Sequence, residues 1–309
     1  MSKKKKMSQS KKKSWGLASV LIAILVGMVL VIFIPRLSAE EITFHDIHGI
    51  GYSGDSLTVA SHTGLTKFSE GKWTVPDGEK HDYMGYSAVK DGFYSSGHPS
   101  RTSKLANPLG VVKGNASGKK ITGLDLEGEM DFHTMTAGYE TKEVYVINLE
   151  KNTRMEEPGL YYTIDDTKTW TKTNMAGVTD PPTTIAAHPT EKGVVAFGTE
   201  HGLYLSRDYG DTFTVIMPEV PVSALAFDHG GNLLVGSLEN EPEVFQLDIS
   251  TKKTKDLKVP VSKNDMVMYV QQNPKDQDEY ALTTFNKNIY LTEDGGGKWD
   301  KIVDEGQTK

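Results

Sequence analysis

Ser206-Arg207-Asp208-Tyr209-Gly210-Asp211-Thr212-Phe213 is a stretch whose residue types return elsewhere in the chain. Thr292-Glu293-Asp294-Gly295-Gly296-Gly297-Lys298-Trp299 keeps the hydroxyl first, an Asp third, a Gly fifth and an aromatic residue last. Thr163-Ile164-Asp165-Asp166-Thr167-Lys168-Thr169-Trp170 keeps all of these except the Gly. We call these three stretches the repeat boxes.

The repeat boxes are regularly spaced. They begin at residues 163, 206 and 292, so the intervals are 43 and 86 residues, and 86 is twice 43. Weaker polar turns fill the remaining positions of the pattern, at Phe68–Trp73, Lys113–Lys120 and Ile249–Lys255. A period of about 40 to 50 residues is the size of one four-stranded propeller blade. The sequence therefore predicts an all-β, six-bladed β-propeller of four-stranded blades over 42–303, followed by a polar tail at 304–309.

The repeat boxes resemble the Asp-box, also called the BNR repeat, of sialidase-like and sortilin-like propellers. In that family the motif forms the turn between the third and fourth strands of a blade, away from the central pocket. Its Asp accepts hydrogen bonds from the turn, and its aromatic residue packs between blades. The resemblance implies a structural role for Asp165, Trp170, Asp208, Phe213, Asp294 and Trp299. The boxes therefore predict architecture and not chemistry.

Composition excludes several kinds of site. The 309 residues include no cysteine, so disulfides, thiolate zinc sites and cysteine nucleophiles are absent. The formal net charge is −7, although seven lysines precede the first apolar run. Taking these and Arg36 from the 34 basic residues leaves 26, against 41 acidic residues. So acidic a domain is not expected to bind nucleic acid.

The N-terminal region predicts a membrane anchor. The uncharged run that starts at Trp15 is long enough to cross a bilayer core as a helix. The lysines of the basic segment 1–14 place the N-terminus in the cytoplasm. We expect one transmembrane helix at 15–35, a linker at 36–41 and the propeller outside the cell, as a single-pass cell-membrane protein. The alternative is a signal peptide cleaved after Leu37-Ser38-Ala39, which would leave a secreted protein.

Histidines gather in the first half of the repeats. Aligning the first strands of the units places His48, Met84 and His133 in equivalent positions. Asp82 and Asp131 stand just before the last two. Because first strands surround the central channel of a propeller, these side chains are expected at one mouth of it.

His98 follows the second strand of unit two, where the chain would fold back over the same mouth, and His62 is its counterpart in unit one. The predicted ligand-binding residues are His48, Met84, His98 and His133, and the predicted metal ligands are His48, His98, His133 and Asp131. Histidine with methionine suits copper, whereas histidine with aspartate suits zinc or iron. The alternative for each single histidine is that it caps a turn or bonds a buried carbonyl.

Several unit signatures, such as His45-Asp46-Ile47-His48-Gly49 and Asp131-Phe132-His133, resemble a group of bacterial Asp-box propellers labelled glycosyl hydrolases. This resemblance covers nearly all of 42–303. A sialidase, however, needs three arginines around the substrate carboxylate. The arginines of this chain are Arg36, Arg101, Arg154 and Arg207. Because the first is beside the membrane and the last is inside a repeat box, such a clamp cannot be assembled.

Three functions follow. The favoured one is a membrane-tethered propeller that binds a small ligand, glycan or envelope protein at its channel mouth, with a metal as a further expectation. The first alternative is a glycoside hydrolase that acts on envelope or extracellular glycans through a pair of carboxylates. The candidate carboxylates are Asp82, Glu127, Glu129 and Asp131. The second alternative is a scaffold that helps to assemble another envelope protein.

Overall fold

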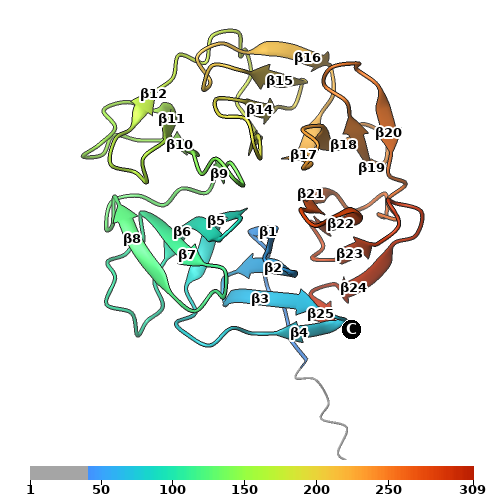
Figure 1. Cartoon of the computed structure of the whole chain (residues 1–309), viewed down its shortest axis with the longest axis horizontal. Coiled ribbons are helices and arrows are strands. Elements are labelled where there is room, and N and C mark those ends of the chain that lie inside the picture. Colours follow the sequence, from blue (N-terminus) through green and yellow to red (C-terminus); the bar gives the residue numbers. More distant parts are fainter. Residues whose placement is uncertain (1–40) are drawn as a thin grey trace, which may run out of the picture. The chain divides into compact units, whose positions relative to one another are not determined.

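The computed structural model describes residues 41–309, and these form a ring of six β-sheets around a central axis (Figure 1). This range contains strands and turns but no helix. The predicted six-bladed, all-β architecture is therefore confirmed. Within the same range, nothing helical is long and apolar enough to span a membrane. The predicted anchor at 15–35 lies outside the described residues.

Each of the first five blades has four strands in chain order, and the last blade has five. The strands of the first three blades are β1 (Gly49–Ser53), β2 (Ser56–Ser61), β3 (Gly64–Ser69), β4 (Lys72–Thr74), β5 (Asp82–Val89), β6 (Gly92–His98), β7 (Val111–Asn115), β8 (Ile121–Asp125), β9 (Met135–Ala137), β10 (Val144–Asn148), β11 (Gly159–Thr163) and β12 (Thr171–Lys172). Those of the last three blades are β13 (Thr184–Ala187), β14 (Val195–Gly198), β15 (Gly202–Ser206), β16 (Thr214–Pro218), β17 (Val222–Phe227), β18 (Leu233–Leu238), β19 (Pro242–Leu247), β20 (Thr254–Asp256), β21 (Val267–Asn273), β22 (Asp276–Thr284), β23 (Ile289–Thr292), β24 (Asp300–Asp304) and β25 (Gln307–Thr308).

Within a blade, consecutive strands pair antiparallel from the axis to the rim. The first hairpin, for example, pairs Gly49 with Ala60 and closes with Ser53 opposite Ser56. The first strands of the blades, β1, β5, β9, β13, β17 and β21, contact one another in a closed circle. These six strands therefore border the central channel (Figure 1).

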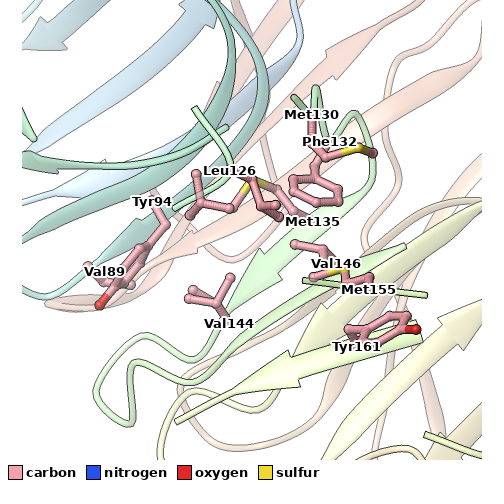
Figure 2. Packing of buried hydrophobic residues seen from close by; sticks show 12 residues of the cluster. Val89, Tyr94, Leu126, Met130, Phe132, Met135, Val144, Val146, Met155 and Tyr161 are labelled. Atoms are coloured by element: carbon pink, nitrogen blue, oxygen red, sulfur yellow. The ribbon is translucent and has the colours of Figure 1, made fainter. Parts of the chain in front are cut away.

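The hydrophobic core lies between neighbouring blades. Middle strands such as β14 and β15 are buried along their whole length, because the blades on both sides cover their faces. Figure 2 shows one such cluster, in which Val89 and Tyr94 of the second blade share a core with Val144 and Val146 of the third. This packing explains why these strands read as short, nearly continuous apolar runs in the sequence.

The three repeat boxes form turns between third and fourth strands, as expected. Asp208 Oδ1 accepts hydrogen bonds from the Ser206 hydroxyl at 2.7 Å and from the Thr212 backbone N–H at 2.9 Å. Ser206 Oγ accepts the backbone N–H of Gly210, whose φ of 94° lies in the left-handed region that favours glycine. The other two boxes repeat these bonds to the backbone. The carboxylate thus fastens the turn from inside.

The weaker turns occupy the same place in their blades. The turn expected from Ile249 begins one residue earlier, because Asp248 Oδ1 accepts the backbone N–H groups of Ser250 at 2.8 Å and Thr251 at 2.9 Å. A capping carboxylate therefore persists although the spacing of the repeat box is lost.

The aromatic residues of the boxes connect neighbouring blades. Trp170 donates its indole N–H to Asp125 Oδ2 at 3.0 Å, and Trp299 donates to the Leu257 carbonyl at 2.9 Å. Both acceptors belong to the preceding blade. Phe213 is 5% exposed and lies in the cluster that joins the fourth blade to the third. The implied structural role of these residues agrees with their contacts.

The two ends of the described chain close the ring. Thr43 pairs with Gln307 of β25, and the Phe44 backbone N–H donates to the Gly306 carbonyl at 2.7 Å. β25 also pairs antiparallel with β24. These contacts correct the prediction of a polar tail at 304–309, which is instead a pairing segment. Backbone pairs are joined there by side-chain bonds, because Thr308 Oγ1 accepts the Ile42 backbone N–H at 3.0 Å and Gln307 Oε1 accepts the Thr43 hydroxyl at 2.9 Å. The partners of this segment lie at the other end of the described chain, so its own sequence does not indicate the pairing.

Candidate functional site

A channel cavity of ≈240 Å³ is lined by residues of all six blades. His48 and His133 line it just before β1 and β9 begin. At the opposite end, past the ends of the first strands, lie Tyr139 and His229, whose ring centroids are 4.8 Å apart. We call the end that His48 and His133 border the histidine mouth.

A second cavity of ≈260 Å³ adjoins the histidine mouth, because His133 and Thr134 line both cavities. The charged or titratable side chains around the second cavity are His98, Glu129, Asp131, His133 and Glu150. Among the described residues, no lysine or arginine lines either cavity. The negative charge of these carboxylates therefore disfavours anionic ligands.

Alternation of buried and exposed side chains places Asp131 and His133 at the mouth. Met130 and Phe132 are buried, with exposed fractions of 5% and 1%, in the core between the second and third blades (Figure 2). The Phe132 backbone N–H donates to Ser96 Oγ of β6 at 2.8 Å, which fixes the segment. Successive side chains of an extended segment point to opposite sides, so Asp131 and His133 face the second cavity.

Two blades repeat the same imidazole–carboxylate pair. His62 directly follows β2, and its Nδ1 lies 2.7 Å from Oδ2 of Asp82, the first residue of β5. His98 ends β6, and its Nε2 lies 3.2 Å from Oδ2 of Asp131, shortly before β9. In each pair, a histidine at the end of a second strand meets an aspartate at the start of the next blade. Equivalent positions of two repeats thus supply the two histidine–aspartate pairs near the mouth.

The two pairs are neighbours, because Asp82 and His98 face each other in the register of β5 and β6. Gly97 makes this close approach possible. Its φ is 136°, and a Cβ atom there would lie 2.0 Å from the Asp82 carbonyl oxygen. The Oδ1 atoms of Asp82 and Asp131 are buried and have no hydrogen-bond partner among the described residues. Buried acceptors of this kind call for water, an ion or a ligand.

His48 joins the first pair. Its Nε2 lies 3.3 Å from His62 Nε2, which in turn lies 3.4 Å from Asp46 Oδ2. Burial lowers the pKa of His48. Burial also lowers the pKa of His62, but the hydrogen bond and charge of Asp82, together with Asp46, outweigh it and raise this pKa. Between the two rings, a proton is therefore held preferentially by His62.

The second cluster is arranged differently. Asp131 Oδ2 lies 2.9 Å from His133 Nε2, and the same oxygen contacts His98. His98 also uses its Nδ1, which lies 2.7 Å from Asn107 Oδ1 in the loop after β6. Both ring nitrogens of His98 therefore have protein partners, and its ring anchors this loop.

The structure divides the predicted metal ligands between these two clusters. In the range 41–309, one group of histidine and acidic residues has ligand atoms that all lie within 4.8 Å of one another, and it consists of Asp46, His48 and His62. His48 does not form such a group with His98 and His133. This arrangement differs from the predicted one because His48 contacts His62, whereas His98 and His133 both contact Asp131.

Met84 lies where the pairing of β5 with β6 shifts between Tyr83 and Tyr86, and it lines neither cavity. An irregularity of this kind changes the direction of a side chain, which a simple alignment of strands does not register.

Two of the predicted carboxylates hold loops. Glu127 Oε1 accepts the Ala106 backbone N–H at 2.6 Å. Glu129 accepts the backbone N–H of Thr153 at 3.0 Å and its hydroxyl at 2.8 Å. Glu129 also borders the second cavity. Of the four candidate carboxylates, Asp82 and Asp131 are the two that contact the histidines.

Asp46 and His62 belong to the mouth although they were not among the predicted ligands. Two signals in the sequence point to them. Asp46 stands two residues before His48, so both side chains lie on one side of an extended segment. His62 occupies the same place in unit one as His98 in unit two. The sequence pattern did not indicate which carboxylate each of His62 and His98 contacts, because these carboxylates come from the next blade.

Two of the described arginines make ion pairs with carboxylates that line neither cavity. Arg154 Nε donates to Asp125 Oδ2 at 2.9 Å, and Arg207 contacts Glu191 at 3.7 Å. Neither residue lines a cavity.

No protein-family model and no curated protein matches the chain. Solved structures are similar to it. A chain of a nidogen/laminin complex matches with a TM-score of 0.60 and 11% identity, over 82% of this chain and 95% of that one. The GH74 enzyme from Niastella koreensis matches with a TM-score of 0.56 and 13% identity, over 86% of this chain and 46% of the enzyme. The extracellular domain of BT4673 from B. thetaiotaomicron matches with a TM-score of 0.52 and 15% identity, over 87% of this chain and 34% of that one.

At these identities the likeness shows the fold alone. This chain spans less than half the length of the GH74 enzyme and of the BT4673 domain. The neighbours include a glycoside hydrolase and an extracellular domain, so one fold serves proteins of different kinds.

Proposed function

We propose that this chain is a membrane-tethered, extracytoplasmic propeller of the Asp-box family that binds a small polar ligand or glycan at the histidine mouth. The observation that carries the proposal is the pair of cavities of ≈240 Å³ and ≈260 Å³ that share His133 and Thr134 in their linings. Cavities of a few hundred cubic ångströms suit small ligands. The imidazole and carboxylate groups around them supply donors and acceptors for hydroxyl and amide groups.

The chemistry of the lining selects among ligands. Glu129, Asp131 and Glu150 give the second cavity negative charge, and Leu149, 77% exposed, adds an apolar surface beside them. A neutral or cationic ligand with both polar and apolar faces fits this lining, as a sugar ring does. An anionic ligand would meet repulsion from the carboxylates.

The proposed location rests on the N-terminal sequence. The apolar run at 15–35 and the lysines before it favour a single-pass anchor with the propeller outside the cell. Glycans of the cell envelope would then be within reach of the mouth.

The test is calorimetric titration of the full-length chain in detergent with a tetramer of N-acetylglucosamine. We expect binding that is lost in Asp131→Asn and in His133→Ala, because these residues line the second cavity. Asp208→Asn, in a repeat box, is the matched control and should bind as the wild type does. Absence of binding, or equal affinity in all four proteins, would contradict the proposal and favour an envelope protein as partner.

A glycoside hydrolase is the second candidate. It is favoured by the buried Oδ1 atoms of Asp82 and Asp131, two neighbouring carboxylates that each keep an acceptor without a partner. Glycoside hydrolysis uses such a pair of carboxylates. Release of reducing ends from the same tetramer, abolished in Asp82→Asn and Asp131→Asn, would establish this reading. The binding proposal predicts that no reducing ends appear.

A further inference from the structure

We infer that Asp46, His48 and His62 form a binding site for a zinc-type divalent cation at the histidine mouth. The inference deepens the proposed function and rests on it for the role of the metal, which would present a positive centre to a ligand. Metal binding itself is a separate property. It is measured without any glycan, so the two proposals can fail independently.

The distances fit one cation. Two ligand atoms bound to zinc at about 2.0 to 2.1 Å with a tetrahedral angle are roughly 3.3 to 3.4 Å apart. His48 Nε2 and His62 Nε2 are separated by 3.3 Å, and His62 Nε2 and Asp46 Oδ2 by 3.4 Å. The third separation, between His48 and Asp46, is within 4.8 Å. Two of the three separations between ligand atoms therefore match a tetrahedral zinc site. A small rotation of the exposed Asp46 side chain would shorten the third, between Asp46 and His48, to the same value.

The tautomers also fit. His62 Nδ1 lies 2.7 Å from Asp82 Oδ2, so this carboxylate favours the neutral tautomer that carries its proton on Nδ1. In that tautomer the Nε2 lone pair faces His48 and Asp46. A carboxylate behind a ligating imidazole orients the ring and makes it a stronger ligand. Asp82 would hold this outer position, which explains its placement at the start of the neighbouring blade.

The equivalent pair in the next blade lacks this arrangement. His98 contacts Asp131 through Nε2 and Asn107 through Nδ1, so neither nitrogen is left for a metal. The His62–Asp82 and His98–Asp131 pairs occupy the same position in their repeats. They differ in the ring nitrogen that contacts the aspartate, which is Nδ1 in His62 and Nε2 in His98. His98 is therefore a matched internal control for His62.

The donor set selects the kind of metal. Two imidazoles and one carboxylate are the ligands of zinc sites that keep a fourth position open. Such a site takes water or a ligand in that position. Asp46, His48 and His62 offer nitrogen and oxygen atoms only, and this donor set favours zinc over the copper expected from Met84.

The experiment is calorimetric titration of the metal-free, full-length chain with zinc chloride. We expect one zinc per chain, with binding lost in His48→Ala, in His62→Ala and in Asp46→Asn. Asp82→Asn should weaken zinc binding about 10- to 100-fold, as loss of an outer-shell carboxylate does. Cobalt(II) substitution should give the intense visible absorption of a tetrahedral ion in the wild type and not in His62→Ala.

His98→Ala and His133→Ala are the controls, and both should bind zinc as the wild type does. Circular dichroism identifies a variant that has not folded, and His62→Gln, a milder change, then takes the place of His62→Ala. The inference is overturned if the wild type takes up no zinc, if His62→Ala or its replacement binds zinc equally well, or if the controls lose it instead.

Discussion

At the scale of single residues, aspartates serve two purposes that their neighbours distinguish. In the repeat boxes the carboxylate accepts bonds from its own turn, as Asp208 does from Ser206 and Thr212. At the histidine mouth Asp82 and Asp131 accept bonds from imidazoles of the preceding blade. A hydrogen bond within one turn can be predicted from residues that are adjacent in the sequence, whereas a hydrogen bond to another blade depends on the tertiary fold. This is why the boxes could be predicted and the pairing of His62 with Asp82 could not.

Replacing Asp208 by alanine should lower the free energy of unfolding by about 1 kcal/mol, as loss of a capping side chain does. The replaced carboxylate is exposed, so a larger effect is not expected. Urea unfolding of Asp208→Ala measures it, with Asp211→Ala in the same turn as a comparison. A binding defect at the mouth in a folded Asp208→Ala protein would contradict the structural role.

Acid should weaken the boxes. Hydrogen bonds lower the pKa of Asp165, Asp208 and Asp294, chiefly those from the Thr169 backbone N–H, the Thr212 hydroxyl and the Lys298 backbone N–H respectively. A carboxyl whose pKa is lower in the folded state stabilises the fold above its unfolded pKa, near 3.8, and this contribution is lost as pH falls through the folded pKa. Stability should therefore fall below about pH 4, less steeply in Asp208→Ala. Urea unfolding at several acidic pH values measures this loss of stability. If the free energy of unfolding falls equally steeply with pH in the wild type and in Asp208→Ala, the prediction is wrong.

At the scale of elements, the segment before β9 shows how the core positions the site. Met130 and Phe132 enter the core between two blades (Figure 2). Asp131 and His133, which alternate with them, line the second cavity as a result. The alternation of these four residues is visible in the sequence. The irregular pairing around Met84 is not, because it depends on how β5 fits its neighbours.

Phe132→Ala should lower the free energy of unfolding by about 3 to 5 kcal/mol, because it removes a fully buried ring. His133→Ala, next to it and exposed, is the matched control and should change stability little. Both are compared by urea unfolding of the full-length chain. A loss below about 1 kcal/mol in Phe132→Ala would show that the ring does not anchor the segment.

At the scale of the whole molecule, the repeat period predicts six blades, and closure of the ring by both chain ends is expected from it, but the period does not predict which residues pair. The period is a local property, repeated six times, whereas closure joins residues that are 264 positions apart, as Thr43 and Gln307 are. Such a contact leaves no mark in the sequence pattern. The same is true of the mouth, whose residues come from the boundaries of three blades.

Removing residues 305–309 should lower the free energy of unfolding by roughly 3 kcal/mol, since several backbone hydrogen bonds worth about 1 kcal/mol each are lost. Gln307→Ala, which keeps the backbone bonds, should have a much smaller effect. The comparison is made by urea unfolding. An unchanged midpoint in the shortened chain would mean that β25 does not hold the ring closed.

The central claim is that the histidine mouth, and not the repeat boxes or the opposite channel end, is the functional site. Histidine side-chain NMR of the full-length chain, titrated with the N-acetylglucosamine tetramer, tests it most directly, because each ring reports its own surroundings. We predict that the signals of His98 and His133 move on titration, while those of His188 and His201, which line neither cavity, stay in place. Movement confined to His229 at the opposite end, or no movement of any histidine signal, would contradict the claim.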